Sequence, residues 1–360
     1  MSISRRAFVT AVPALVGLHA SEKDLTVPSE AVRYPDPATD FNITRLTSPE
    51  HTSLLPSYLG RALFHRGNSL LYSNDRSGSL QPYRMDLKTG QSRQLSEAKL
   101  LDASSLTLFP GEKSCCFMAD GVVWQVNLAN FREREVYRVP AGTQASGFCM
   151  NDDGQFASLV ERLGSKFQLR LLNLARGTAT TVSAGGDEIT DAVPRPRRAG
   201  ILFCLANREL HVVNFDGAQN QKLRTAPGQL GPAMWSQDGR SVFYLHYPDN
   251  ASQLHAIREY TPDSNEDRLV AATSQYVHFG RNSDASVFVG ASGSKASPYL
   301  LLLVRSVKRE LTLCEHKASD PRLAAPIFSP NSQRVFFQTD RHGKLAIYSM
   351  SVERLVEETE

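Results

Sequence analysis

The sequence has little net charge and no long apolar run, and both absences exclude classes of protein. Its 360 residues contain 40 Lys and Arg against 37 Asp and Glu, which gives a net charge of +3. A nucleic-acid-binding protein usually carries a clustered basic surface, so this balance argues against that class. A membrane-spanning helix needs about 20 consecutive apolar residues, and the sequence has no such run. We therefore expect no nucleic-acid partner and no membrane span.

Cysteine is also scarce, and its spacing excludes a disulfide framework or a zinc site. Five cysteines, an odd number, occur at 115, 116, 149, 204 and 314. The sequence contains neither a Cys-x-x-Cys pair nor the alternating Cys and His spacing of zinc-binding modules. Each cysteine stands in or beside an apolar stretch, so we predict that they are small buried hydrophobic residues. A strained disulfide between the adjacent Cys115 and Cys116 is the alternative.

The first twenty residues have the pattern of a twin-arginine export signal. Arg5 and Arg6 precede an apolar run from Ala7 to Leu18 that is too short to span a bilayer and contains Pro13. The pattern predicts export to the periplasm or the extracellular space, with cleavage near Ala20. Removal of residues 1–20 takes away two arginines and no acid, so the charge falls from +3 to +1. The alternative is an uncleaved apolar N-terminus.

A recurring unit dominates the rest of the sequence. It is clearest at Phe64–Ser96, at Trp235–Leu245 and at Phe328–Met350, where polar turns separate short apolar strands. From Phe64 to Phe328 is 264 residues in six intervals, a mean period of 44. This period is typical of the four-stranded blades of a β-propeller, and repeats of this kind close into a ring around a channel.

We therefore predict an all-β, seven-bladed propeller formed by residues 42–360 as a single domain. The strands are β-branched or aromatic runs between Asp-Gly or Asn turns. Residues 42–47 resemble residues 91–96, so an N-terminal strand is expected to complete the last blade and remove an open sheet edge. Residues 21–41 form a proline-containing leader, and residues 352–360 form either a short helix or a last strand. An array of two-sheet sandwiches is the alternative architecture.

The order of these segments resembles one family in particular. The residues concerned are Tyr34-Pro-Asp36 before Thr44–Thr47, Asn74–Gly78, Leu87–Gly90, Ala192–Pro196, Val277–Phe279 and Phe328–Pro330. They are similar to the TolB-like propeller repeat and, in their order, to the oligogalacturonate lyases of polysaccharide lyase family 22. The resemblance implies β-elimination on short oligogalacturonides during pectin breakdown. It also implies an acidic oligosaccharide as partner and Mn²⁺ as cofactor.

The resemblance places the metal ligands on a small set of positions. One metal-binding histidine of the family falls on His278, and a glutamine ligand falls near Asp320. Two further histidines fall on Leu323 and Ala325, which cannot bind a metal. His278 and Asp320 are therefore the candidate metal ligands. The alternatives are a hydrogen-bonded histidine between strands and a solvated loop carboxylate.

The family's other functional positions are also changed here, so the catalytic residues remain unknown. The base histidine falls on Pro232, and two more histidines fall on Asp191 and Leu55. An arginine of the family falls near Arg208. Arg195 begins an Arg-Pro-Arg-Arg run. Since guanidinium groups pair with carboxylates, Arg195 and Arg208 are the candidate substrate-binding residues. The alternative for the run is a solvated loop.

Two hypotheses about function follow. The first is an exported lyase that cleaves oligogalacturonides by elimination. The second is a non-catalytic TolB-like propeller that binds an oligosaccharide or a protein partner through its channel face. The order of segments favours the first, and the missing histidines favour the second.

Overall fold

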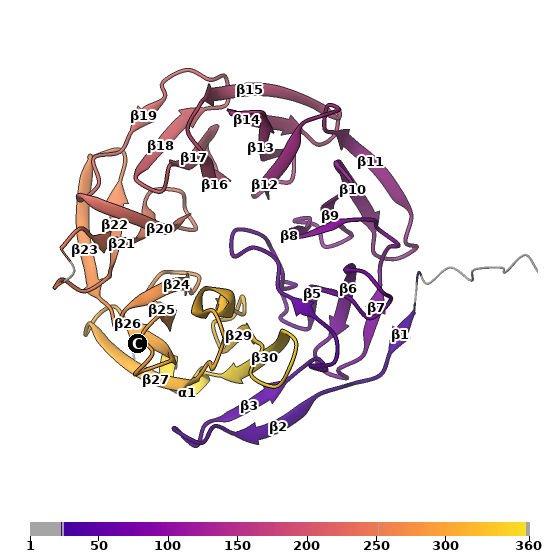
Figure 1. Ribbon diagram of the computed structural model, residues 1–360, viewed down its shortest axis with the longest axis vertical. Coiled ribbons are helices and arrows are strands. Elements are labelled where there is room, and N and C mark those ends of the chain that lie inside the picture. The colour runs from indigo at the N-terminus through magenta and orange to yellow at the C-terminus, as the bar shows by residue number, and fades with distance from the viewer. Residues whose placement is uncertain (1–22, 24, 251, 358–360) are drawn as a thin grey trace, which may run out of the picture.

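Seven antiparallel sheets surround a central channel as blades (Figure 1). The computed structural model describes residues 23, 25–250 and 252–357. The prediction of an all-β, seven-bladed propeller is therefore confirmed. The predicted export signal, residues 1–20, lies outside the described residues. A short helix, α1 (Glu353–Glu357), follows the last strand and decides between the two expectations for the C-terminus.

Each blade begins at the channel and proceeds outward along the chain. The first blade consists of β4 (Ser53–Leu54), β5 (Ser69–Asn74), β6 (Gln81–Asp86) and β7 (Ser92–Gln94), and the second of β8 (Leu101–Leu108), β9 (Ser114–Ala119), β10 (Val122–Asn127) and β11 (Glu133–Arg138). The third blade consists of β12 (Gln144–Met150), β13 (Phe156–Leu163), β14 (Lys166–Asn173) and β15 (Thr178–Gly185), and the fourth of β16 (Ile189–Pro194), β17 (Gly200–Leu205), β18 (Glu209–Asn214) and β19 (Gln221–Lys222).

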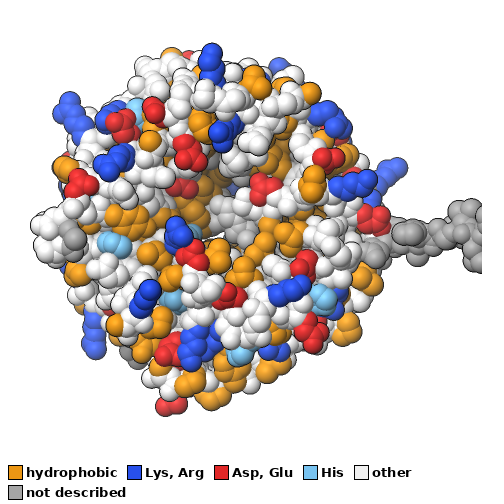
Figure 2. Space-filling view, in the orientation of Figure 1, with side chains coloured by type: hydrophobic (Ala, Val, Ile, Leu, Met, Phe, Trp, Pro, Cys, Tyr) orange, Lys and Arg blue, Asp and Glu red, His pale blue; other side chains and the backbone are white. Residues whose placement is uncertain are grey.

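The last three blades have the same order. The fifth blade consists of β20 (Gly228–Trp235), β21 (Val242–Pro248), β22 (Ala256–Thr261) and β23 (Glu266–Ala272), and the sixth of β24 (Tyr276–Arg281), β25 (Val287–Ser292), β26 (Tyr299–Val304) and β27 (Arg309–Glu315). The seventh contains β28 (Ile327–Phe328), β29 (Arg334–Thr339) and β30 (Ala346–Ser351). Figure 2 shows a hollow in the middle of the face turned to the viewer, with hydrophobic side chains around it.

The N-terminal segment completes the last blade, as predicted. The strand β3 (Asn42–Arg45) pairs with β30, and Ile43 lies opposite Met350. The sheet then extends by one more strand, β2 (Val32–Pro35), which the sequence pattern did not predict. Earlier in the chain, β1 (Thr26–Val27) pairs with β7 on the first blade. The segment therefore joins the first and seventh blades along the outside of the ring (Figure 1).

The hydrophobic core lies between neighbouring blades rather than in one centre. One cluster combines Leu70 and Tyr83 of the first blade with Phe336 and Ile347 of the seventh. All five cysteines are buried and free, which confirms the prediction for them and excludes the adjacent pair as a disulfide. Since burial disfavours the charged thiolate, it raises the pKa of Cys115 and Cys149 to about 12.

Tight turns connect the strands within a blade, and one glycine shows how closely they pack. Gly239 has φ of +69° in the turn between β20 and β21. A Cβ at this position would lie 2.4 Å from the carbonyl oxygen of Pro196 in the preceding blade. Only glycine satisfies both the left-handed backbone and this close approach.

Candidate functional site

One loop enters the middle of the ring and forms the centre of the candidate site. It connects β4 to β5 and projects into the channel (Figure 1). Tyr58 packs beside the core of the fifth and sixth blades, and Leu59 contacts the cores of the fourth, fifth and sixth blades. A segment of the first blade therefore contacts the opposite side of the ring.

Irregular pairing of the inner strands aims polar side chains at this loop. The register of β16 with β17 shifts between Thr190 and Val193, and Asp191 has φ of +48° within that shift. The register of β24 with β25 shifts between Tyr276 and His278. A β-bulge redirects the side chains of its strand, so these two irregularities direct Asp191 and His278 towards the loop.

Tyr58, Asp191 and His278 form a compact polar cluster. The Tyr58 hydroxyl donates a 2.7 Å hydrogen bond to Oδ1 of Asp191. The Tyr58 ring meets the imidazole of His278 edge-on, with the ring centroids 4.9 Å apart. Nδ1 of His278 is buried and has no hydrogen-bond partner in the described part of the chain. The cluster therefore joins blades one, four and six at the channel.

Burial controls the protonation of this cluster. It raises the pKa of the Asp191 carboxyl to about 6, although the hydrogen bond from Tyr58 works against that rise. Burial also raises the pKa of the Tyr58 hydroxyl well above its usual value, and the charge of Asp191 adds to this effect. Burial lowers the pKa of His278 to about 4. At neutral pH the imidazole is therefore neutral, and Asp191 titrates close to that pH.

The candidate metal ligands do not form a manganese site. Asp320 accepts hydrogen bonds from the backbone N–H and the guanidinium of Arg322, and it begins the 3-10 helix Pro321–Ala324. Leu323 is exposed, and no group of three or more His, Cys, Asp or Glu side chains that could hold a metal ion occurs among the described residues. Mn²⁺ prefers several oxygen or imidazole ligands, so one buried imidazole and an engaged carboxylate do not fit it.

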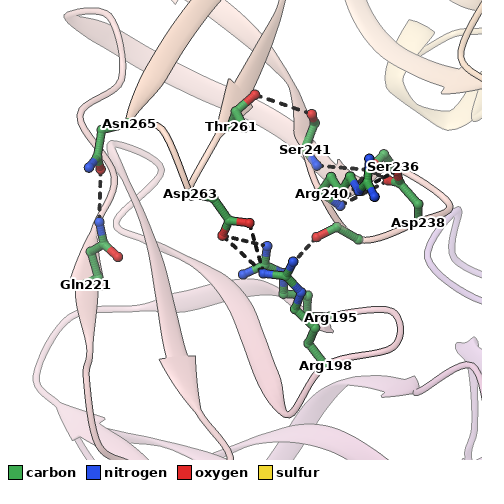
Figure 3. A network of polar contacts seen from close by, with 11 residues as sticks. Arg195, Arg198, Gln221, Ser236, Asp238, Arg240, Ser241, Thr261, Asp263 and Asn265 are labelled. Atoms are coloured by element: carbon green, nitrogen blue, oxygen red, sulfur yellow. Dashed lines mark hydrogen bonds and ion pairs between the residues drawn. The ribbon is translucent and has the colours of Figure 1, made fainter.

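Arg195, a candidate substrate-binding residue, is buried and engaged within the protein. Its Nε donates to the Gly239 carbonyl at 2.7 Å, and its guanidinium stacks over the Trp235 ring at 4.8 Å. Both Arg195 and Arg198 pair with Asp263 of the next blade (Figure 3). These contacts give Arg195 a role in joining blades four and five.

The second candidate, Arg208, is placed differently. It is exposed in the turn between β17 and β18, near the start of β16, where Asp191 lies. Its backbone N–H donates to Leu205, and no side-chain contact is found for it among the described residues. The structure therefore leaves the Arg208 guanidinium accessible, and its contact with substrate remains a prediction.

The positions expected for catalytic histidines carry no base at Pro232 and Leu55. Leu55 is buried in the core of the first blade, and Pro232 lies in the irregular part of β20. Sequence reasoning identified neither Tyr58 nor Asp191 as a site residue. No local pattern marks Tyr58, because its importance depends on a contact with a residue 133 positions later.

The chain is similar to known oligogalacturonate lyases in both sequence and structure. The chain is 24% identical to the oligogalacturonide lyase of Pectobacterium atrosepticum and 22% identical to the oligogalacturonate lyase of Dickeya dadantii, over 89% of this chain and 95% of each relative. A solved oligogalacturonate lyase in complex with manganese superimposes with a TM-score of 0.86 at 23% identity, over 91% of this chain and 98% of the other. No family model matches the chain.

No helix within the described ranges is both long and apolar enough to cross a membrane.

Proposed function

We propose that this protein, which resembles the oligogalacturonate lyase family in sequence order and in fold, is a lyase-like propeller of pectin breakdown that recognises oligogalacturonides without manganese. The whole-length similarity to two lyases supports the ligand class. The proposal that manganese is not needed rests on the Tyr58–Asp191–His278 cluster. This cluster offers one neutral imidazole, whereas a metal site needs several ligands. The pattern of residues 1–20 supports export by the twin-arginine route, which remains a proposal.

The described residues at the channel offer what an acidic sugar needs for binding. Tyr58 and Tyr247 are half-buried, so each presents part of an aromatic ring for stacking against a sugar. Arg322 is exposed on the 3-10 helix that packs against β24. Burial raises the pKa of Tyr247 to about 12, and the charge of Arg322 works against that rise, so the guanidinium lies near this phenol. The Arg322 guanidinium pairs with Asp320 through Nε and Nη2, and we infer that its remaining N–H donors pair with a uronate carboxylate.

Calorimetric titration with trigalacturonate in the presence of EDTA tests this proposal. Wild type should bind, Arg322→Gln should bind at least about tenfold more weakly because a charge-assisted hydrogen bond is lost, and Tyr58→Phe should weaken binding less. Tyr137→Phe is the matched control, because Tyr137 also donates to a carboxylate, Glu161, but on the outer strand β11. Binding that requires Mn²⁺, or no binding at all, contradicts the proposal.

Metal-independent elimination is a second candidate, favoured by the raised pKa of Asp191. A carboxylate that titrates near pH 6 is a suitable general base at neutral pH. In this reaction Asp191 takes the proton from the carbon beside the uronate carboxylate. The electrons of that C–H bond form the new C=C bond, and the glycosidic oxygen departs and takes a proton from water.

The ultraviolet absorbance of the unsaturated uronate separates the two candidates. A signal that grows in EDTA and is lost in Asp191→Asn supports elimination by Asp191. Binding without any signal in wild type supports recognition alone. A signal that appears only with Mn²⁺ contradicts both.

A further inference from the structure

The other end of the channel holds a cavity whose arginines the proposed function does not use. Its volume is about 660 Å³, and residues at and after the C-terminal ends of the inner strands line it, among them Phe109, Trp235 and Phe328. Asp191 and His278 lie earlier in β16 and β24. Tyr58 and the loop that carries it also line the cavity, and the Tyr58 hydroxyl reaches from this loop to Asp191 in the polar cluster.

Three arginines line this cavity, and none of them forms an ion pair with a carboxylate of the described residues. The guanidinium of Arg61 donates one hydrogen bond, to the backbone carbonyl of Asp152 at 2.7 Å. Arg281 donates to the backbone carbonyls of Trp235, Asn282 and Ser283. Arg197 is exposed and has no side-chain partner in the described part of the chain. Since a guanidinium has five N–H donors, most donors of Arg61 and Arg197 are available to a ligand.

The arginines are held in place without losing their charge. Burial lowers the pKa of both Arg61 and Arg281, because removal from water disfavours the charged form. Nearby carboxylates work against this fall in pKa, Asp152 and Asp153 for Arg61 and Asp238 and Asp284 for Arg281, but none of them forms an ion pair with these guanidinium groups. The two carboxylates that line the same cavity are Glu112, which accepts the backbone N–H of His65, and Asp152, which is exposed. The cavity therefore has more positive than negative side chains.

We propose that this cavity is a second binding site, for a small sugar acid. The guanidinium groups of Arg61 and Arg197 would pair with its carboxylate, and the half-buried rings of Phe109 and Phe328 would contact the sugar ring. The volume is within the range of about 300–1,000 Å³ of ordinary ligand sites. Arg281 has a structural role, because its hydrogen bond to the Trp235 carbonyl joins blades five and six and stabilises that wall of the cavity.

Tryptophan fluorescence reports on this site directly. The sequence has two tryptophans, Trp124 on β10 and Trp235 on the cavity wall. In a Trp124→Phe background, only Trp235 emits. Titration of this protein with D-galacturonate should change the emission in a saturable manner, whereas neutral D-galactose should leave it unchanged.

Variants then locate the binding. Arg61→Gln should raise the apparent Kd at least about tenfold and Arg197→Gln about threefold, because each removes part of the charge-assisted pairing. Arg197 makes no side-chain contact within the described protein, so its variant tests the site even where Arg61→Gln reduces stability. Arg268→Gln is the matched control, since Arg268 is an exposed arginine on the outer strand β23 that pairs with Glu266.

The outcomes separate this site from the proposed function. Arg322→Gln should leave the Trp235 signal unchanged while it weakens trigalacturonate binding. An unchanged Kd in both Arg61→Gln and Arg197→Gln overturns the cavity proposal, as does an equal response to galactose. Loss of the Trp235 signal in Arg322→Gln also overturns it, because the sugar acid would then bind at the opposite end of the channel.

Discussion

The hydroxyl of Tyr58 donates a hydrogen bond of 2.7 Å to the carboxylate of Asp191, across the channel from blade one to blade four. No other side-chain partner is found for Asp191 in the described part of the chain. The contact therefore satisfies a carboxylate that is largely removed from water, and it fixes the loop on which Tyr58 lies.

Removal of the Tyr58 hydroxyl should destabilise the fold. We expect Tyr58→Phe to lower the free energy of unfolding by about 1–3 kcal/mol, because the half-buried Asp191 carboxylate loses its hydrogen-bond partner. Tyr137→Phe should cost less, because Glu161 keeps its ion pair with Arg170. Urea unfolding at pH 7 measures both. Equal effects of the two substitutions would show that the Tyr58–Asp191 contact contributes no more to stability than the Tyr137–Glu161 contact.

The N-terminal closure should contribute measurably to stability. Ile43 of β3 is fully buried against the sixth and seventh blades, so Ile43→Ala should cost about 2–5 kcal/mol through lost burial and a cavity. Val32→Ala on the neighbouring β2 removes an exposed side chain and should change stability by less than about 0.5 kcal/mol. Thermal or urea unfolding distinguishes them. A small effect of Ile43→Ala would mean that the ring is stable without its closing strand.

Asp191 should make the fold less stable as pH rises. Its folded pKa of about 6 lies above the ordinary 3.8, so the folded state holds its proton more tightly. This stabilisation is complete below about pH 3.8 and is lost as pH rises through 6; the two-unit shift sets an upper limit of about 3 kcal/mol. The stability of Asp191→Asn relative to wild type should therefore increase between pH 4 and pH 6.5. Asp320→Asn removes a carboxyl whose pKa is lowered from 3.8, so its relative stability should stay nearly constant between pH 4 and pH 6.5 and should increase only as the pH falls below about 3.8.

His278 should show the reverse dependence on pH. Its folded pKa of about 4 lies below the ordinary 6.5, so its contribution is present above pH 6.5 and is lost as pH falls through 4. His278→Phe should therefore gain stability relative to wild type as the pH is lowered. Urea unfolding at several pH values measures this difference. A relative stability that does not change with pH would show that the imidazole is accessible to solvent in the folded protein.

Manganese should not stabilise the protein. A bound metal at a hundred times its Kd would add about 2.7 kcal/mol and raise the melting temperature by several degrees. Since the described residues offer no set of three ligands, we expect the melting temperature to be the same with Mn²⁺, with EDTA and with neither. A rise with Mn²⁺ that disappears in His278→Phe would contradict this expectation.

The five thiols should be unreactive in the folded protein. Burial raises the pKa of each, so the reactive thiolate is scarce and inaccessible. At pH 8 a thiol reagent should modify none of them in the native state and all five in denaturant. A native thiol that reacts at once would show that a blade opens locally.

The sequence by itself determined the blades and their closure. The 44-residue period and the turn residues indicated four-stranded blades that bury their apolar faces against their neighbours, and the likeness of residues 42–47 to residues 91–96 indicated that an N-terminal strand closes the ring. The order of segments also indicated the resemblance to the oligogalacturonate lyases, and the substituted positions Leu323, Ala325 and Pro232 already indicated that several metal and base histidines of that family have no counterpart here.

Only the tertiary structure decided which side chains meet in the channel. Tyr58, Asp191 and His278 come from three blades and have no common local pattern; a loop and two irregular strands bring them together. The structure also decided the roles of the arginines. Arg195 is engaged between blades, whereas Arg61 and Arg197 keep free donors at the other end of the channel. Sequence spacing carries no information on such contacts, because the curvature of the ring sets the distance between residues of different blades.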